Sequence, residues 1–445
     1  MDEMKILTAH VDDPHQIDID TYELHGGYQA ISKALSGIPP QNLINMIKQS
    51  ELRGRGGAGF LTGMKWDFIP KNSPLPKYVV CNADESEPGT FKDRLLIERD
   101  PHQIIEGIIL ASYAIGAHLS FIYCRGEYYQ GNAILRKTIE QAKKKGYLGK
   151  NIFGSNYSLD IIVHPGAGAY IAGEETAQLN SLEGYRATPR FKPPFPAVEG
   201  LYNKPTIINN VETLCAVVHI VNRGVDWFKS IGKPKNTGTK IFQISGHIQR
   251  PGCYEFPLGV TLRQVLDAAG GMRPGRTFKA CYPGGSSCAL LTANDMDICL
   301  DFETLMGRQT ALGTASIIVM DDTADMVKVA TRLMEFYQNE SCGKCTPCRE
   351  GTRWMVQVLS RIEAGKGTFS DLKLIVDVCT NMAATSFCAL AIGAAPPIIS
   401  AIKDFPSEFE AYVRRNPDAD RPQKMPIAYP YIAKKTPEAA LPFSG

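Results

Sequence analysis

The sequence lacks an excess of charge of either sign. Its 48 Lys and Arg nearly cancel its 46 Asp and Glu, which leaves a formal net charge of +2. A surface without a strong positive field gives no electrostatic reason to bind nucleic acid or an anionic membrane. We therefore expect no nucleic-acid partner, and we expect membrane association only through other proteins.

Long apolar runs and evenly spread cysteines are also absent. No stretch of about 18 apolar residues is available to span a bilayer, and residues 1–7 lack the basic and apolar regions of a secretory signal. Only 12 of the 445 residues are cysteine, and three of these are clustered. A small disulfide-stapled fold would spread its cysteines, so we expect a reducing compartment and cysteines used for cofactor chemistry.

A chain of 445 residues is too long for one hydrophobic core, and about three domains are expected. In the first half, short apolar runs that predict buried strands alternate with stretches that predict helices, which indicates an α/β sandwich. The predicted strands are residues 78–81, 119–123 and 160–164, and the predicted helices are 41–52, 100–117, 128–145, 176–182 and 214–221. The first 50 residues show only one helical pattern.

The second half changes character twice. Residues 232–238 have the composition of a linker, and the next stretch predicts a compact β-grasp module, with a hairpin at 239–245 and 252–256, a helix at 261–268 and strands at 278–282 and 316–320. Within it, Cys281 and Cys288 are interpreted as packed residues. Four helices at 324–338, 349–364, 371–378 and 389–403 then predict a bundle, and a proline-rich tail follows residue 415.

Residues 340–349 concentrate three cysteines, Cys342, Cys345 and Cys348, at three-residue spacing. Three thiolates within one turn of backbone suit several corners of an iron–sulfur cubane, and a fourth must come from elsewhere. Cys388 is the leading candidate and Cys379 is the competitor. Zinc is the main alternative, although its sites usually take cysteines in separated pairs, and an unligated loop is the other. The spacing favours a [4Fe-4S] cluster.

Residues 53–60 form a loop with four glycines in six positions. It formally fits G-x-G-x-x-G, but a predicted helix precedes it where a Rossmann fingerprint requires a strand, so we reject that label. Backbone without side chains lets amides approach a ligand, and two arginines with Lys65 can neutralise phosphate. A merely flexible loop is the alternative.

Three further stretches carry candidate chemistry, and two of them follow predicted strands. Residues 82–90 crowd three acids, residues 165–176 form a second glycine-bearing turn that opens a helix, and Asn209 and Asn210 precede another helix. Open α/β sheets place their sites at the carboxyl ends of strands, and helix N-termini suit anions. Each stretch also has a structural interpretation, as a solvated turn, as acids in a first helical turn, or as a helix cap.

Together these stretches resemble the family of NADH-oxidising, flavin-bearing subunits of respiratory complex I. The resemblance runs from about residue 26 to about residue 412. Six separated motifs carry it, at residues 53–59 with 65–66, and at 82–90, 173–176, 192–196, 209–213 and 340–349, the last with 386–388.

The resemblance implies residue roles. Glu87, Lys65 and Glu175 would be catalytic, and Phe60, Phe68 and Phe195 would hold the adenine with Lys192 nearby. Glu175, and after it Glu87, would favour NADH over NADPH by repelling a 2′-phosphate. The other flavin mononucleotide (FMN) and NADH residues would be Arg55, Gly56, Gly57, Gly59, Asn82, Asp84, Gly173, Glu174, Asn209, Asn210 and Thr213, and the cluster ligands Cys342, Cys345, Cys348 and Cys388.

The resemblance also implies the architecture. We expect a Rossmann-like α/β flavin domain after an N-terminal segment (1–235), a β-grasp, ubiquitin-like and SLBB-like domain (236–322), a helical bundle carrying the iron–sulfur cluster (323–415) and an extended tail (416–445).

The implied activity is NADH oxidation with quinone as the eventual acceptor. NADH gives up two electrons as a hydride whereas a cluster accepts one at a time, so a flavin must stand between them. The implied partners are a thioredoxin-like [2Fe-2S] subunit and a large multi-cluster subunit, at the cytoplasmic side of the bacterial inner membrane. The alternatives are a diaphorase subunit of a soluble NAD-linked hydrogenase or formate dehydrogenase, and a non-enzymatic iron–sulfur scaffold.

Overall fold

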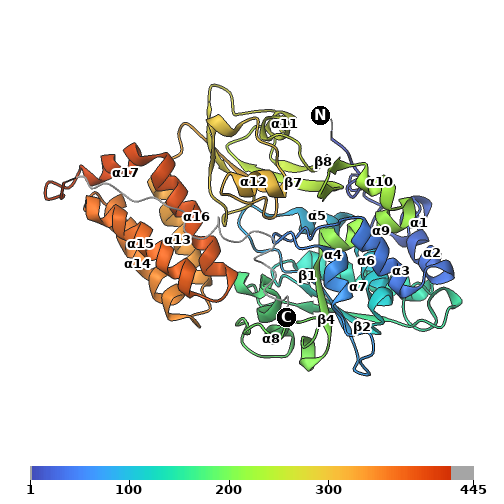
Figure 1. Ribbon diagram of the computed structural model, residues 1–445. Coiled ribbons are helices and arrows are strands. Elements are labelled where there is room, and N and C mark those ends of the chain that lie inside the picture. The colour runs from blue at the N-terminus through green and yellow to red at the C-terminus, as the bar shows by residue number, and fades with distance from the viewer. Residues whose placement is uncertain (1–2, 422–445) are drawn as a thin grey trace. The chain divides into compact units, whose positions relative to one another are not determined.

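The computed structural model describes residues 3–421, coloured along the chain in Figure 1. The predicted tail lies outside the described residues from position 422 onward. Contacts divide the chain into two units. The first comprises Met1–Ser86, Thr90–Gln243 and Cys253–Val260, and the second comprises Glu87–Gly89, Ile244–Gly252 and the chain from Thr261 onward. The four predicted domain bounds stay a prediction.

The first unit is built on a four-stranded parallel sheet. Its strands are β1 (Tyr78–Ala83), β2 (Leu119–Cys124), β3 (Asp160–Pro165) and β4 (Thr206–Asn210), and three were predicted from their apolar runs. They lie in the order β3-β2-β1-β4. The chain therefore adds strands on one side of β1 and then crosses to its other side. This reversal between β1 and β4 is the switch point at which open α/β sheets bind ligands.

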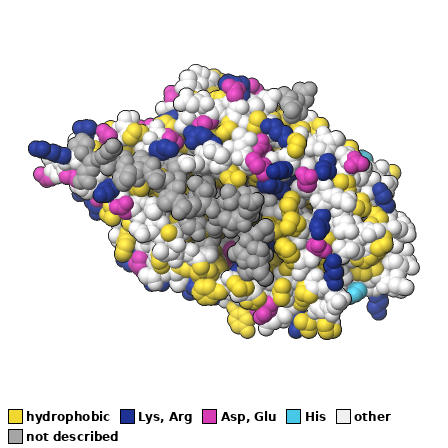
Figure 2. All heavy atoms as spheres, in the orientation of Figure 1, with side chains coloured by type: hydrophobic (Ala, Val, Ile, Leu, Met, Phe, Trp, Pro, Cys, Tyr) yellow, Lys and Arg dark blue, Asp and Glu magenta, His cyan; other side chains and the backbone are white. Residues whose placement is uncertain are grey.

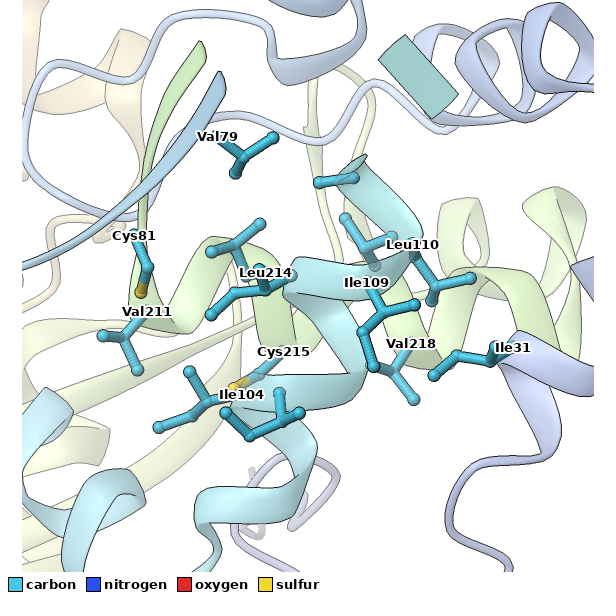
Figure 3. Close-up of a cluster of buried hydrophobic side chains, with 14 of the residues drawn as sticks. Ile31, Val79, Cys81, Ile104, Ile109, Leu110, Val211, Leu214, Cys215 and Val218 are labelled. Carbon is cyan, nitrogen blue, oxygen red and sulfur yellow. The ribbon is translucent and has the colours of Figure 1, made fainter. Parts of the chain in front are cut away.

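Both faces of this sheet are covered. Helices α6 (Pro101–Ile115) and α9 (Val211–Arg223) pack against one face, and Figure 3 shows Ile104, Leu214 and Cys215 meeting between them, near Val79 and Cys81 of β1. On the other face Val80 and Ile208 pack with residues of α8 (Glu175–Leu182). Each buried apolar side chain contributes about 1.5–3 kcal/mol, so the strands are fixed from both sides.

The predicted helices are confirmed with shifts of a few residues. The structure has α3 at Pro40–Gln49, with Leu43, Ile44 and Ile47 buried as the periodicity predicts, and α7 at Tyr129–Lys144. Asp100 precedes Pro101 at the start of α6, but its carboxylate does not cap the helix, because it accepts hydrogen bonds from the side chains of Gln16 and Gln103. Short helices without a strong pattern were not predicted: α4 (Thr62–Asp67), α5 (Lys92–Arg99) and α10 (Val225–Lys229).

The expectation of a single helix in the first 50 residues is wrong, because α1 (Ile19–Leu24) and α2 (Gln29–Gly37) precede α3. A buried carboxylate distant in sequence holds them. Glu106 accepts hydrogen bonds from the Tyr22 hydroxyl at 2.5 Å and from the backbone amides of Tyr28 and Ala30 at 2.9 and 3.0 Å.

A second buried carboxylate holds the start of the chain. Glu255 accepts hydrogen bonds from the amides of Ile6, Leu7 and Thr8 at 2.8, 3.1 and 3.0 Å, and from the hydroxyls of Thr8 and Thr239. Burial raises the pKa of Glu255 although these hydrogen bonds lower it. Removing such an acceptor would leave several buried donors unpaired.

The linker prediction for residues 232–238 is wrong. These residues form a two-stranded antiparallel ladder of β5 (Gly232–Lys233) and β6 (Asn236–Thr237), and Asn236 and Thr237 are buried. The Thr237 hydroxyl donates to the Ser50 carbonyl at 2.8 Å, so tertiary contacts order a segment whose composition is typical of a loop.

A five-stranded sheet follows, in the order β10-β9-β11-β7-β8. Its strands are β7 (Thr239–Gly246), β8 (Gly252–Pro257), β9 (Phe278–Tyr282), β10 (Leu291–Thr292) and β11 (Ser316–Asp321), and α11 (Leu262–Ala268) begins with a capping box between Thr261 and Gln264. The predicted hairpin, helix and strands are confirmed, and α12 (Phe302–Gly307) is additional. Cys281 and Cys288 are buried, as predicted.

The second unit ends in helices α13 (Met326–Glu340), α14 (Thr346–Glu363), α15 (Phe369–Thr385) and α16 (Ala389–Asp404), which pack against one another. All four were predicted. A fifth, α17 (Pro406–Val413), was not, although Pro406 occupies the first-turn position that proline favours.

On the face drawn in Figure 2, Lys and Arg side chains alternate with Asp and Glu, which agrees with the balanced composition. None of the helices within residues 3–421 combines the length and apolar character needed to cross a bilayer.

Candidate functional site

The loop between α3 and α4 is shaped by its glycines. Gly57 and Gly59 have φ angles of +126° and +67°, which disfavour other residues. A Cβ added to Gly56 would lie 3.0 Å from the Asn210 Cβ, so the loop approaches the end of β4 closely. The structure thus brings the predicted Gly56 beside the predicted Asn210.

Arg55 is buried within this loop. Its amide donates to the Thr213 hydroxyl at 2.8 Å, and its Nη2 donates to the Thr237 carbonyl at 2.7 Å. Its Nε and Nη1 are buried without a hydrogen-bond partner among the described residues. Burial lowers the Arg55 pKa to about 10. A cation with unused donors is costly to bury, which fits a site that receives an anion.

The predicted residues at the end of β1 contact the second glycine turn. The Asn82 amide donates to the Gly173 carbonyl at 2.9 Å, and its oxygen accepts from the Asp84 amide at 3.1 Å and from Gln178 Nε2 at 2.9 Å. Gln178 lies one turn after Glu175 on α8 and is fully buried. It was not among the predicted site residues, although its helical spacing from Glu175 was a usable signal.

The two asparagines at the end of β4 have different roles in the structure. Asn210 is the N-cap of α9, because its oxygen accepts from the Glu212 amide at 3.0 Å, and it also accepts from Lys92 and donates to Asp93. Asn209 is held by the indole of Trp66, which donates to its oxygen at 2.7 Å. The sequence left a cap and an amide donor open for this pair, and the capping role belongs to Asn210.

A buried ion cluster lies behind Asn210. Lys92 Nζ is 2.6 Å from Asp93 and 3.1 Å from Glu212, and Lys240 also pairs with Glu212. Burial would raise the Glu212 pKa, but Lys240, Lys92 and Arg55 lower it overall. The cluster therefore holds Asn210 rigidly.

Glu175 joins two predicted lysines. Its carboxylate is 2.8 Å from Lys65 Nζ and 2.7 Å from Lys192 Nζ, and Lys192 also lies 3.2 Å from Glu174. Burial alone would raise the Glu175 pKa, but Lys65 and Lys192 lower it to about 2. Glu174 is the N-cap of α8, accepting from the amides of Thr176 and Ala177 at 2.9 Å. The side chain at 175 is thus an anion between two cations at neutral pH.

Two of the predicted adenine-binding phenylalanines are neighbours. The Phe60 and Phe68 ring centroids are 6.1 Å apart, and both side chains are exposed, as is Phe195. Exposed aromatic faces are what a planar base needs for stacking.

Glu87 belongs to the second unit by its contacts. Its carboxylate accepts from the Ser287 amide at 2.8 Å and from the Ser286 hydroxyl at 3.1 Å.

The four predicted cluster cysteines influence one another electrostatically. Burial, with smaller contributions from Cys348, Cys342 and Cys345, raises the pKa of Cys388 to about 11. Cys345 and Cys388 are the N-cap residues of α14 and α16, where unpaired backbone amides favour a thiolate. The competitor Cys379 is fully buried, with its sulfur 3.0 Å from the Met355 sulfur.

The donor chemistry fits both groups that the resemblance implies. For a flavin phosphate there are the two unpartnered Arg55 donors, the Lys65 ammonium and the glycine-rich loop that contains Arg55. For a cubane there are Cys342, Cys345 and Cys348 around the start of α14 and Cys388 at the start of α16. Among residues 3–421 no Cys, His, Asp or Glu group is gathered tightly enough to hold a single ion. A cubane needs ligands spread over its corners, because each thiolate binds a separate iron.

Sequence profiles of known families match three parts of the chain. The profile described as the Nuo51 FMN-binding domain matches residues 47–219, the SLBB domain matches residues 241–289, and the NADH-ubiquinone oxidoreductase-F iron-sulfur binding region matches residues 328–412. An α/β FMN-binding domain, an SLBB domain and a helical iron–sulfur region define the class: a flavin- and iron–sulfur-dependent oxidoreductase component.

Full-length relatives identify the family. The F 2 subunit of NADH-quinone oxidoreductase of Rhizobium meliloti is 51% identical over 92% of this chain and 97% of that relative, and the F subunit of the Escherichia coli enzyme is 46% identical over 91% and 92%. The chain belongs to the family of F subunits of NADH-quinone oxidoreductase, respiratory complex I. A solved NAD⁺-reducing [NiFe]-hydrogenase is also similar, with a TM-score of 0.80 and 34% identity, covering 96% of this chain and 69% of that one.

Proposed function

We propose that this chain oxidises NADH at the carboxyl ends of β1 and β4, in a Rossmann-like α/β flavin domain, with Cys342, Cys345, Cys348 and Cys388 holding a [4Fe-4S] cluster in the helical bundle. As an F subunit of complex I, the chain takes electrons from NADH by way of FMN and delivers them to an iron–sulfur cluster. The observation that carries the proposal is the reversal of strand order at β1/β4, because Asn82 and Asn210 lie opposite each other there and Gly56 lies beside Asn210.

FMN, when bound, takes two electrons from NADH and releases them singly. Gly56, Gly57 and Gly59 let backbone amides approach it, and Arg55 and Thr213 fix that loop. Lys65, held by Glu175, supplies a positive charge that stabilises a reduced flavin. Asn82, Gly173 and Asp84 are joined by the hydrogen bonds described above and would also contact the flavin.

Selective binding of NADH requires a surface on which its adenine can stack and a group that excludes the 2′-phosphate of NADPH. We propose that Phe60, Phe68 and Phe195 stack on the adenine, that Lys192 lies beside it, and that Glu175 repels a 2′-phosphate, with Glu87 second. Glu175→Ala should improve the relative kcat/KM for NADPH by about tenfold, the equivalent of about 1.4 kcal/mol. An unchanged NADH to NADPH preference would move this role to another residue.

The finer assignments of the second half are also proposals. We interpret the SLBB region as a β-grasp module, because α11 follows the hairpin β7–β8 and further strands complete a five-stranded sheet. Complex I membership implies other complex I subunits as partners. We propose that these include a thioredoxin-like [2Fe-2S] subunit and a large multi-cluster subunit, in the hydrophilic arm at the cytoplasmic side of the bacterial inner membrane.

Reconstitution tests the proposal directly. The full chain, purified anaerobically and supplied with FMN, iron and sulfide, should bind one flavin and about four irons, and NADH should reduce ferricyanide with bleaching of the flavin. A protein that binds iron but no flavin would instead be a scaffold. Co-purification with hydrogenase subunits from the native source would support the diaphorase alternative.

A further inference from the structure

Trp66 is one of three tryptophans in the chain and is fully buried on α4. Its indole Nε1 donates to the side-chain oxygen of Asn209 at 2.7 Å. Asn209 lies at the end of β4 and is 6% exposed. Within residues 3–421 its Nδ2 makes no hydrogen bond, so one end of the amide is used and the other is not.

The Trp66 indole determines the orientation of the Asn209 side-chain amide. An asparagine amide is nearly symmetric in shape, and its two orientations differ only in where the donor and the acceptor point. Indole is a donor without acceptor capacity, so it pairs only with the amide oxygen. Trp66 therefore forces Asn209 to present its NH₂ group on the side away from the indole.

The Asn209 Nδ2 is not one of the buried polar atoms that lack a partner, so this donor is accessible and can meet a ligand. Asn209 stands at the β1/β4 edge, beside Asn210, which the glycine loop approaches. FMN offers only acceptors at its phosphate and its ring carbonyls. If the Asn209 amide were turned the other way, its oxygen would face an oxygen of the flavin and no hydrogen bond would form.

We propose that Trp66 is a positioning residue for FMN: its indole N–H fixes the Asn209 amide so that Nδ2 donates to an oxygen of the flavin. This inference rests on the proposed FMN site. It predicts that the binding effects of Trp66 and Asn209 are not independent, since Trp66 acts only through Asn209.

The test measures the affinity of the full-length apoprotein for FMN, by quenching of flavin fluorescence. Trp66→Phe and Asn209→Ala should each weaken binding about tenfold, and the double variant should be no weaker than Asn209→Ala alone. Asn209→Asp keeps an acceptor for the indole but removes the donor, so it should bind at least as weakly as Asn209→Ala. Trp227→Phe and Trp354→Phe are the matched controls and should bind FMN as the wild type does.

Trp66→Phe also removes packing, so a second replacement separates the two effects. β-(3-Benzothienyl)alanine at position 66 keeps the bicyclic shape and replaces only the N–H, and it should weaken FMN binding by the same factor as Trp66→Phe. Wild-type FMN affinity in the benzothienylalanine variant would overturn the inference while leaving the FMN site intact. The same holds if the losses of affinity from Trp66→Phe and Asn209→Ala multiply in the double variant. A wild-type protein that binds no FMN would overturn the proposed function together with the inference.

Discussion

Replacing Glu175 with glutamine should make the first unit less stable at neutral pH and remove an acid-sensitive part of its stability. The carboxylate lies between Lys65 and Lys192 at 2.8 and 2.7 Å, and its pKa falls from the usual 4.5 to about 2. At about 1.4 kcal/mol for each pH unit, this fall corresponds to about 3 kcal/mol. The Glu175 side chain is 24% exposed, so solvent screening makes this an upper value.

The sign of the pH dependence follows from the direction of the pKa. A carboxyl group whose pKa is lowered by folding stabilises the folded state fully above its unfolded pKa, here 4.5. That stabilisation disappears as the pH falls toward 2. The stability difference between wild type and Glu175→Gln should therefore be constant from pH 7 down to about 5, shrink below 4.5, and approach zero near pH 2.

Urea unfolding followed by Trp66 fluorescence measures this difference. A background with Trp227→Phe and Trp354→Phe leaves Trp66, next to Lys65, as the sole indole. The matched control is Glu140→Gln on α7, whose carboxylate is 63% exposed and 3.8 Å from Lys143, and it should change stability by at most about 0.5 kcal/mol. A loss for Glu175→Gln that is equally large at pH 7 and pH 3 would refute the electrostatic reasoning.

Three further outcomes are expected. Cys388→Ser should lose the cluster, seen as lost iron and a lost electron paramagnetic resonance signal, whereas Cys379→Ser should keep both because Cys379 packs against Met355 in the core. Gly56→Ala should weaken FMN binding about tenfold because its Cβ would press on Asn210 at 3.0 Å, whereas the control Gly54→Ala, whose nearest neighbour is at 3.5 Å, should not. Lys344→Met should lower the midpoint potential of the cluster by tens of millivolts, because it removes a positive charge near the cluster ligands. Lys344 Nζ lies 5.1 Å from the Phe387 ring centroid, between the two segments that carry those ligands. An unchanged potential in a redox titration would contradict this prediction.

Local patterns were sufficient to predict much of this fold. The apolar runs that became β1, β2 and β3 and the periodic stretch that became α3 are determined by burial, which operates on neighbouring residues. Helices α1 and α2 could not be predicted in the same way. They depend on Glu106, a carboxylate about 80 residues away, and no local pattern reveals such a partner.

The candidate site shows the same division. Lys65, Glu175, Asn209 and the cysteines could be predicted as site residues, because each stands within a short motif that is visible in the sequence. Trp66 holds Asn209 and Gln178 holds Asn82 across 143 and 96 positions, and no local pattern reveals contacts at such separations. Whether Asn209 or Asn210 caps α9 was also open, because both positions carry a residue type that can cap, and only the packing of Lys92 and Asp93 decides it.

The hydrogen bonds between Glu255 and the amides of residues 6–8 have a consequence for folding during translation. The amides of Ile6, Leu7 and Thr8 are translated before their acceptor, which follows some 250 residues later. At about 5–20 residues per second, these amides wait for roughly 12 to 50 seconds before their partner exists. During that interval the nascent first unit is incomplete, and its unpaired amides are accessible to chaperones.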